Sequence, residues 1–526
     1  MTGEWMAGLR TRPGGRRGGA GEEPSGVAAP TATARLSAVW SWVLIAAMGV
    51  VAHPVAVVVG MVLIGVVLFV PDVPNRELLV MPIAGTVFNV LGAAARRNRP
   101  PGRVVRPAEE PELAALVRGV AAQLDFHAPL LVRVLPVPEV GLVPVKVSNQ
   151  RGYALVLGWP LLRRLTAVQL TAVVAHEIAY QQNLLSRRDR MLGVTRGMVE
   201  ASLDNRIRAP RAVSGWLLRA TQEYLWRAEI VADARSVEVV GTAAVLGALR
   251  QVPVITTTFE HFVDDWVSVL AEDGCYPEDL YDALDAALDD PHVVRRTLAA
   301  VADDETVDPY SAASHPPLPV RRAALPEGVS AGRDDSRPVL LRQADNVQRW
   351  CLRELFPAGR EDLKVDKEDG ADSAEGVGAG SEGLRPTRVL DTSPERFDIA
   401  VDAGAELMRA TGQDSISSAV ATAVDALAEG SWPRLARAIE PGVGSAPPPL
   451  RATAVRDVMV GCLAHTISGL LRDAGWESAS RWLTTVLLDP DGAVVDVREL
   501  IEQAVDSGDP AAVRALLGAV TPRAAA

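Results

Sequence analysis

The sequence predicts a mostly helical α+β protein, in which a transmembrane hairpin precedes a mixed central domain and a helical C-terminal domain. Three observations lead to this fold class. Residues 36–70 carry no charged side chain, strand-like segments alternate with helical patterns between 108 and 184, and an acidic, glycine-rich stretch at 366–386 separates two helical regions. The chain therefore combines a membrane segment with at least two folded parts.

Composition narrows the classes of function. The 526 residues can form two or three domains with sizeable cores. The formal net charge of −12 argues against nucleic acid as the main partner, because nucleic-acid-binding proteins need positive surfaces. The three cysteines, Cys275, Cys351 and Cys462, are far apart and show no CxxC spacing. We therefore expect reduced, buried thiols, with no disulfide framework and no cysteine zinc site.

The uncharged stretch is too long for one membrane crossing. Its 35 residues, 36–70, would form a helix of about 52 Å, whereas the hydrocarbon core of a bilayer is about 30 Å thick. His53 and Pro54 divide the stretch into two similar halves, and proline favours a turn at this point. We predict a hairpin of two crossings with Trp40 and Trp42 near an interface. A buried hairpin of a soluble protein is the alternative.

Arginine placement predicts which side of the membrane the domains face. Five arginines lie between residues 10 and 35, and five more lie between 96 and 106. Both flanks favour the cytoplasm under the positive-inside rule, which an even number of crossings satisfies. The apolar stretch 78–95 contains Pro82 and Asn89, so we expect an interfacial or core helix there. The main domains are thus predicted to be cytoplasmic parts of a multi-pass cell-membrane protein.

The predicted parts follow from these patterns and from the loop signals between them. They are a disordered tail at 1–34, the hairpin at 35–71, a juxtamembrane segment at 72–104, a central domain at 105–330, a linker region at 331–385 and a helical C-terminal domain at 386–526.

The central domain has a readable order of elements. A helix is expected over 108–125, a strand over 130–134, and a β-hairpin with strands at 143–147 and 153–157. Thr166 and Gln169 have capping-box spacing, which predicts a helix from 167 to 184. A second long helix is expected from 214 to 240, with Gly241 as its stop, and a loop is expected at 314–321. The strand before the first long helix could pair with an extended peptide.

The residues with the clearest chemistry lie inside the helix at 167–184. His176 and Glu177 begin a motif that is one residue short of His-Glu-x-x-His, because Tyr180 stands in place of the second histidine. Residues four apart share a helix face, so the complete motif offers two imidazoles to one metal ion. Glu229 and Asp233 stand one turn apart on the second long helix, and a catalytic zinc needs three protein ligands.

These motifs resemble those of the M48 family, membrane-associated zinc endopeptidases of the gluzincin type. The resemblance covers roughly residues 105–325 and includes a transmembrane pair before the domain. The matching residues are Ala-Val-Val-Ala-His-Glu-Ile-Ala at 172–179, Asn183, Glu229 with Ala232 and Asp233, Asp308-Pro309-Tyr310, and His315-Pro316-Pro317-Leu318 with Arg321. The resemblance implies a zincin-like fold, one zinc ion and a polypeptide substrate.

The resemblance also implies roles for single residues. His176 and Glu229 would be zinc ligands, Glu177 would be the general base, and Asp233 would orient a ligand without binding the metal itself. Tyr180 departs from the family pattern, and a phenol, which ionises near pH 10, binds zinc far less readily than neutral imidazole.

Two hypotheses follow from this departure. In the first, the protein is a weakened or inactive peptidase that binds polypeptide at the membrane. In the second, it is an active zinc metalloendopeptidase in which His315 joins His176 and Glu229 as a ligand. Tyr180 would then be a weak extra ligand or an oxyanion donor, and Glu177 would remain the base.

Plainer interpretations exist for several of these residues. Glu229 and Asp233 could pair with Arg227 and Arg235 on a helix surface, and His315 before two prolines could form only a loop turn. His261 and Asp265 are predicted to be a solvated helical pair.

Overall fold

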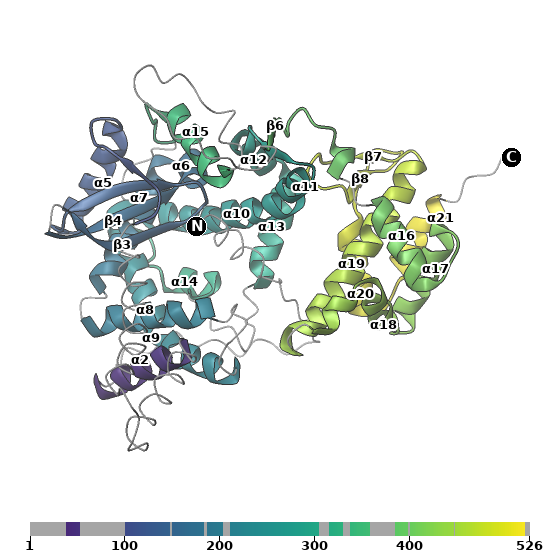
Figure 1. The fold of residues 1–526 in the computed structure, drawn as a ribbon, viewed down its shortest axis with the longest axis horizontal. Helices are drawn as coiled ribbons and strands as arrows, with labels where there is room; N and C mark the ends of the chain where they lie inside the picture. The colour runs from purple at the N-terminus through teal and green to yellow at the C-terminus, as the bar shows by residue number, and fades with distance from the viewer. Residues whose placement is uncertain are drawn as a thin grey trace, which may run out of the picture. The chain divides into compact units, whose positions relative to one another are not determined.

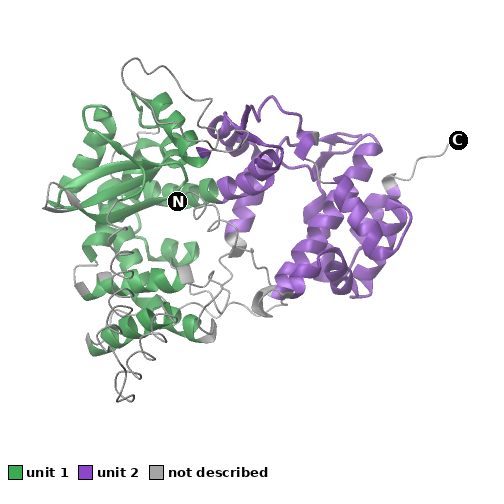
Figure 2. Ribbon diagram, in the orientation of Figure 1, with its two compact units in different colours: residues 1–11, 23–256, 307–355 green, residues 12–22, 257–306, 356–526 purple. Residues whose placement is uncertain are grey.

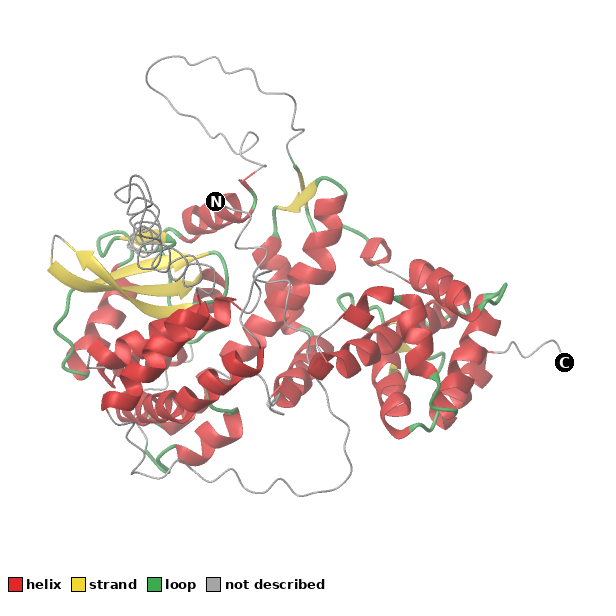
Figure 3. Ribbon diagram, turned by 60° about the horizontal axis from the view of Figure 1, so that its bottom comes forward, coloured by secondary structure: helices red, strands yellow, loops and turns green. Residues whose placement is uncertain are grey.

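The structure is a computed structural model. It describes residues 38–52, 100–147, 150–183, 187–202, 211–304, 315–329, 337–357, 384–397, 400–445 and 448–520. These residues form a mostly helical α+β protein with small sheets, which confirms the predicted fold class at that level (Figures 1 and 3). The chain divides into two compact units, and the described residues of the first fall within 38–256 and 315–355 (Figure 2).

The first unit contains a four-stranded sheet. Its strands are β1 (Arg103–Val105), β2 (Leu130–Leu135), β3 (Val140–Val147) and β4 (Gln150–Gly158), in the order β1-β2-β4-β3. Strands β3 and β4 form the predicted antiparallel hairpin, whereas β2 and β4 are parallel. Strand β3 lies at the edge of the sheet, so its outer side pairs with no other described strand.

Gly158 lets the sheet lead directly into the helices. A Cβ atom at this position would lie 2.3 Å from the carbonyl oxygen of Val137, closer than real atoms approach. Only glycine fits here, where β4 ends and helix α6 (Trp159–Arg164) begins. Helix α7 (Ala167–Asn183) follows after a short break.

Helix α7 starts at the predicted capping box. The backbone N–H of Thr166 donates to Gln169 Oε1 at 3.0 Å, and the backbone N–H of Gln169 donates to Thr166 Oγ1 at 3.2 Å. Leu170, Val174 and Ile178 are fully buried, and the helix packs against β3, against α5 (Pro111–Gln123) and against α9 (Arg211–Val240). Burial of this apolar side fixes the rotation of α7 and therefore the direction of its polar side chains.

Helix α9 is the second long helix and ends where the sequence predicts. Gly241 has φ +86°, a left-handed conformation that glycine adopts without strain. The helix begins three residues before the expected start at 214, because Arg211–Val213 continue the helical backbone. Helices α8 (Arg187–Ser202) and α10 (Thr242–Phe262) lie before and after it in the chain.

The first half of the predicted hairpin forms helix α2 (Ala38–Ala52). It packs against α8 and α9, with Leu44 and Met48 fully buried, and Trp40 meets Trp216 of α9 edge to face. The tail at 1–34 and the remainder of the hairpin and juxtamembrane segment, 53–99, lie outside the described residues.

One helix among the described residues is long and apolar enough for a membrane crossing. This is the segment Arg451–Asp473, with 23 residues and a mean hydropathy of 1.3. Its most apolar window is 61% buried inside the protein, and Met459, Val460 and Leu463 belong to the core of the second unit. Burial of this kind is typical of the central helix of a folded domain.

The predicted linker region contains an ordered helix. Helix α15 (Ala344–Leu355) belongs to the first unit and buries Val347, Cys351 and Leu352. The carboxylate of Glu110, itself buried, accepts the backbone N–H groups of Arg342 at 2.6 Å and Gln343 at 2.7 Å. Glu110 thereby ties the start of this helix to a segment more than two hundred residues earlier.

The second unit takes in residues 257–304 as well as 356–520, so the compact units do not follow the boundaries predicted at 330 and 386. Two contacts explain this. Strand β5 (Cys275–Pro277) pairs with β6 (Arg385–Thr387), and buried Asp279 accepts the backbone N–H groups of Val389 and Leu390 at 2.7 and 3.0 Å.

Helices of varied length and short strands make up the remainder of this unit. They are the π-helix η1 (Val263–Val267), α11 (Ser268–Glu272), α12 (Leu280–Asp289), α13 (Pro291–Asp304), η3 (Pro394–Phe397), α16 (Ala400–Thr411), α17 (Ile416–Ala428), α18 (Trp432–Ile439), η4 (Pro441–Ser445), α19 (Pro448–Asp473), β7 (Glu477–Ser478), β8 (Val486–Leu488), β9 (Val494–Asp496), α20 (Val497–Ser507) and α21 (Ala511–Val520).

The three cysteines are free and buried, as the sequence predicts.

Candidate functional site

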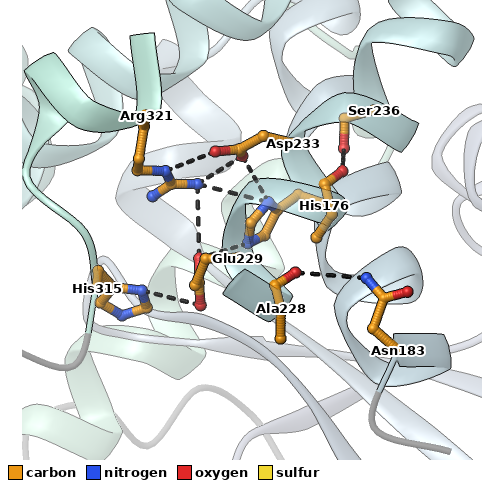
Figure 4. Close-up of polar contacts among 9 residues, drawn as sticks. His176, Asn183, Ala228, Glu229, Asp233, Ser236, His315 and Arg321 are labelled. Atoms are coloured by element: carbon orange, nitrogen blue, oxygen red, sulfur yellow. Dashed lines mark hydrogen bonds and ion pairs between the residues drawn. The ribbon is translucent and has the colours of Figure 1, made fainter. Parts of the chain in front are cut away.

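Two packed helices bring the predicted site residues together. His176, Glu177 and Tyr180 come from α7, and Glu229 and Asp233 come from consecutive turns of α9. Figure 4 shows Glu229 and Asp233 directed at His176 from the neighbouring helix. Asn183, at the end of α7, donates from Nδ2 to the backbone oxygen of Ala228 at 3.4 Å and adds a direct bond between the two helices.

His176 lies between the two carboxylates of α9. Its Nδ1 lies 2.9 Å from Asp233 Oδ1 as a hydrogen bond, and its Nε2 lies 3.1 Å from Glu229 Oε2. The second contact is within ion-pair distance but is not aligned as a hydrogen bond, which leaves buried Glu229 Oε2 without one. The helix-surface interpretation of these two acids is therefore wrong, and Arg235 instead pairs with Glu238.

The segment around 315–321 completes the cluster. His315 Nδ1 lies 3.1 Å from Glu229 Oε1, although the His315 side chain is 64% exposed. Arg321 donates two hydrogen bonds to the Asp233 carboxylate, from Nε to Oδ2 at 2.8 Å and from Nη2 to Oδ1 at 2.7 Å. The expected loop at 314–321 is only partly correct, because helix α14 (Leu318–Ala324) starts after Pro317 and carries Arg321. Proline fits the first turn of a helix, where its missing N–H costs nothing.

Burial and charge set the protonation of this cluster. Burial alone lowers the pKa of His176, but the charge of Glu229 and the hydrogen bond to Asp233 outweigh it and raise the pKa to about 10. Burial opposes ionisation of Glu229, yet His176 and His315 hold its pKa well below the usual value. Arg321 and His176 likewise overcome burial and lower the pKa of Asp233. The cluster thus balances two carboxylates with Arg321 and a protonated His176.

Tyr180 occupies the position of the missing second histidine. Its ring stacks on that of His176, with centroids 6.2 Å apart and planes inclined by 11°. Burial, followed by the charges of Glu229 and Glu177, raises the pKa of the Tyr180 phenol. The side chain therefore remains a neutral phenol at physiological pH and offers no anionic oxygen to a metal.

A cavity of ≈ 210 Å³ opens beside the cluster. Its lining comes from the sheet edge, from three helices and from the segment before α14, and consists of Val140, Glu177, Tyr180, Gly193, Arg196, Gly197, Glu200, Leu225, Glu229 and His315. Glu177 is half-buried here, and burial raises the pKa of its carboxyl group. Val140 is the first residue of β3, so the free sheet edge begins at the cavity.

The donor set can be tested for its fit to zinc. Two ligands of a tetrahedral zinc ion are about 3.3 Å apart, given metal–ligand bonds of about 2.0–2.2 Å. The 3.1 Å between His176 Nε2 and Glu229 Oε2 agrees with this spacing and equally with a direct ion pair. A third donor near these two atoms would favour a zinc site over an ion pair. The nearest candidate, His315, instead approaches the other oxygen of Glu229, Oε1. Among the residues that the structure describes, no three His, Cys, Asp or Glu side chains form a metal-holding group. As they lie in this structure, the described residues bring together two donors at zinc-ligand spacing but no third.

One wall of the cavity was not predicted. Helix α8 contributes Gly193, Arg196, Gly197 and Glu200, from a segment in which no element was expected. Arg196 is 3% exposed, and its Nη1 donates to Leu218 O at 2.5 Å and to Thr221 Oγ1 at 2.9 Å. The sequence did hold a signal for this helix. Gly193 and Gly197 are four residues apart, as are Arg196 and Glu200, and this spacing indicates a helix with one open side.

The other histidines weighed in the sequence lie apart from this cluster. His261 and Asp265 are exposed, in agreement with the predicted solvated pair. His127 is 85% exposed and pairs with Asp125. Asp308, Pro309 and Tyr310, which contribute to the family resemblance, lie outside the described residues.

Comparisons with known proteins do not identify the chain. No protein-family model, no curated protein and no solved structure matches it.

Proposed function

We propose that this chain is a membrane-anchored protein of M48 peptidase type, with a zincin-like central domain, whose degenerate metal site binds polypeptide without zinc-dependent cleavage. One observation carries the proposal. Glu229, the candidate third ligand, is engaged directly by His176 and His315 at 3.1 Å and by Arg321 at 3.6 Å. Side chains that would bind a metal are thus paired with one another, and position 180 supplies a neutral phenol.

The edge of the sheet supports polypeptide as the ligand. Strand β3 has an outer side that no described strand pairs with, and its first residue, Val140, lines the cavity. An extended peptide can add to such an edge through backbone hydrogen bonds, which are independent of sequence. Alternate side chains of the peptide would then point towards the cavity.

Helix α2 supports the membrane anchor. It is apolar on every side, since Leu44 and Met48 are fully buried while Val39, Trp42 and Val50 are 75%, 47% and 50% exposed. A helix that is hydrophobic all round is typical of a core or a membrane span. We propose that the predicted hairpin, 35–71, holds the chain in the cell membrane with its main domains in the cytoplasm. A reporter fused after residue 110 should signal from the cytoplasm, and a signal from the other side would contradict this topology.

Zinc content and cleavage test the central proposal. The full chain, purified in detergent, should carry far less than one zinc ion per molecule after dialysis. Its digestion of casein should not exceed that of a Glu177→Gln variant, with or without a chelator. Binding of an extended peptide to the same preparation should be unaffected by the chelator, because the proposed contacts need no metal.

An active zinc metalloendopeptidase is the second candidate, and one observation favours it. Glu229 Oε2 is buried without an aligned hydrogen bond, so a lone pair remains for another ligand. In this case His176, Glu229 and His315 would hold the metal, with Glu177 as general base. Near-stoichiometric zinc that is lost in His315→Ala, together with casein cleavage that is lost in Glu177→Gln, would favour this candidate and reject the first.

A further inference from the structure

The charges around the cavity do not cancel. Three glutamates line it, Glu177, Glu200 and Glu229, against one arginine, Arg196, and one histidine, His315, which faces Glu229. The Arg196 guanidinium is already paired, because its Nε lies 2.9 Å from Glu200 Oε1 and its Nη1 donates to Leu218 O and Thr221 Oγ1. Glu229 is likewise engaged, as described above. Glu177 remains, and it makes no hydrogen bond or ion pair with another residue that the structure describes.

The α8 wall leaves room above this carboxylate. A Cβ atom added at Gly193 or at Gly197 would meet no atom within 4 Å, so both glycines border open space. The cavity of ≈ 210 Å³ is larger than an engineered protein cavity of about 150 Å³ that holds benzene. A long side chain from a bound polypeptide therefore fits into it.

We propose that the cavity binds the cationic group of a lysine or arginine side chain of the polypeptide held along β3, with the Glu177 carboxylate as its counter-ion. The inference rests on the proposed function and names the class of residue that the site selects. A half-buried carboxylate without a hydrogen-bond donor is unfavourable, and a guanidinium or ammonium group supplies both charge and hydrogen-bond donors. One such cation needs a single carboxylate and space, whereas zinc needs three converging donors.

The test uses the full chain in detergent and fluorescein-labelled decapeptides of alternating valine and threonine. A single central position is lysine, arginine, norleucine or glutamate, and affinity is measured by fluorescence anisotropy. The lysine and arginine peptides should bind about 10- to 100-fold more tightly than the norleucine peptide, as expected for a charge-assisted hydrogen bond. The glutamate peptide should bind most weakly.

Glu177→Gln should remove this preference, so that the lysine and arginine peptides bind no more tightly than the norleucine peptide. The matched control is Glu223→Gln, an exposed carboxylate on α9, which should keep the preference. Gly197→Leu provides a second route, because leucine favours the helix while its side chain fills the cavity. It should weaken binding of the lysine and arginine peptides to the level of norleucine.

The outcomes separate the inference from the proposed function. Equal binding of all four peptides, or a preference that survives in Glu177→Gln, would overturn the inference and leave polypeptide binding intact. Failure of every peptide to bind would overturn the proposed function together with the inference. The amino terminus of the peptide is another source of positive charge. It is tested with a peptide whose lysine side chain is acetylated and whose amino terminus is free, and tight binding of that peptide would also overturn the inference.

Discussion

Arg321 holds Asp233 through both carboxylate oxygens, with bonds of 2.8 Å and 2.7 Å, and Asp233 in turn bonds His176 at 2.9 Å. The pair is nearly enclosed, since the side chains of Arg321 and Asp233 are 14% and 2% exposed. Asp233 therefore depends on Arg321 for its charge balance, and His176 depends on Asp233 for its orientation.

Removal of this arginine should destabilise the protein strongly. Arg321→Ala leaves the buried Asp233 charge without its main partner, and loss of one member of a buried pair typically costs about 3–5 kcal/mol. Arg321→Lys keeps the charge but loses the two-pronged geometry, so its effect should be smaller. The measurement is urea unfolding of the full chain. Arg235→Ala is the control, since its pair with Glu238 is 46% and 64% exposed and should contribute no more than about 1 kcal/mol. Equal losses in Arg321→Ala and Arg235→Ala would contradict this account.

Tyr180→His should create zinc affinity. The new imidazole would stand one helical turn from His176, on the side where the two rings now stack. With His176 and Glu229 it would supply the three ligands that the wild-type chain does not gather. Zinc content after dialysis is the readout, and Tyr180→Phe is the control because it has no donor atom. If Tyr180→His holds no more zinc than Tyr180→Phe, the likeness of α7 to a metal helix loses its support.

Glu110→Ala should loosen the start of α15. The buried carboxylate accepts two backbone N–H groups, and leaving them without a partner should cost about 1–3 kcal/mol. Amide hydrogen exchange at Arg342 and Gln343 should accelerate more than exchange elsewhere in the first unit. Glu109→Ala is the control, because the partner of Glu109 among the described residues is Arg106, whose side chain is 77% exposed. Unchanged exchange at both amides in Glu110→Ala would show that the carboxylate does not hold this helix.

His465 should make the second unit less stable in mild acid. Burial, followed by the charges of Arg498, Arg296 and Arg472, lowers its pKa from 6.5 to about 4. Its Nδ1 faces Thr484 Oγ1 at 3.3 Å, a contact that adds no charge. Between these two pKa values His465 is protonated in the unfolded chain but not in the folded chain, so the free energy of unfolding falls as the pH drops from 6.5 to about 4.

The loss due to this histidine is at most about 3.5 kcal/mol, because each pKa unit between 6.5 and about 4 corresponds to about 1.4 kcal/mol. The free energy of unfolding, measured at pH 7 and at pH 4.5, should fall less in His465→Gln than in the wild type. His127→Gln is the control, since the His127 side chain is 85% exposed. An identical fall in His465→Gln and in the wild type would reject this explanation.

Local sequence signals predicted the elements that hold the site. Thr166 with Gln169 gave the start of α7, and Gly241 gave the end of α9, because a cap and a left-handed stop act within a few residues. The resemblance to the M48 family pointed to His176, Glu229, Asp233 and His315, and the structure brings these four residues into one cluster.

Contacts between distant parts of the chain were not predictable in this way. The α8 wall depends on the packing of α2, α8 and α9, and the bond from Glu110 to residue 342 has no local pattern. The domain boundary at 330 failed because β5 pairs with β6 across more than a hundred residues. A single sequence shows which side chains can form such contacts but not which partner they find.

The interleaving of the two units has a consequence for the order in which the nascent chain can fold. The first unit cannot be complete until α15 has left the ribosome, because the Glu110 carboxylate accepts backbone N–H groups at the start of that helix. The segment 257–304 meets its own partners later still, when β6 and the helices after it have been synthesised. The first unit can therefore finish folding only after 257–304 has been translated, and 257–304 stays without its partners, with apolar surface exposed, until the residues after 356 follow.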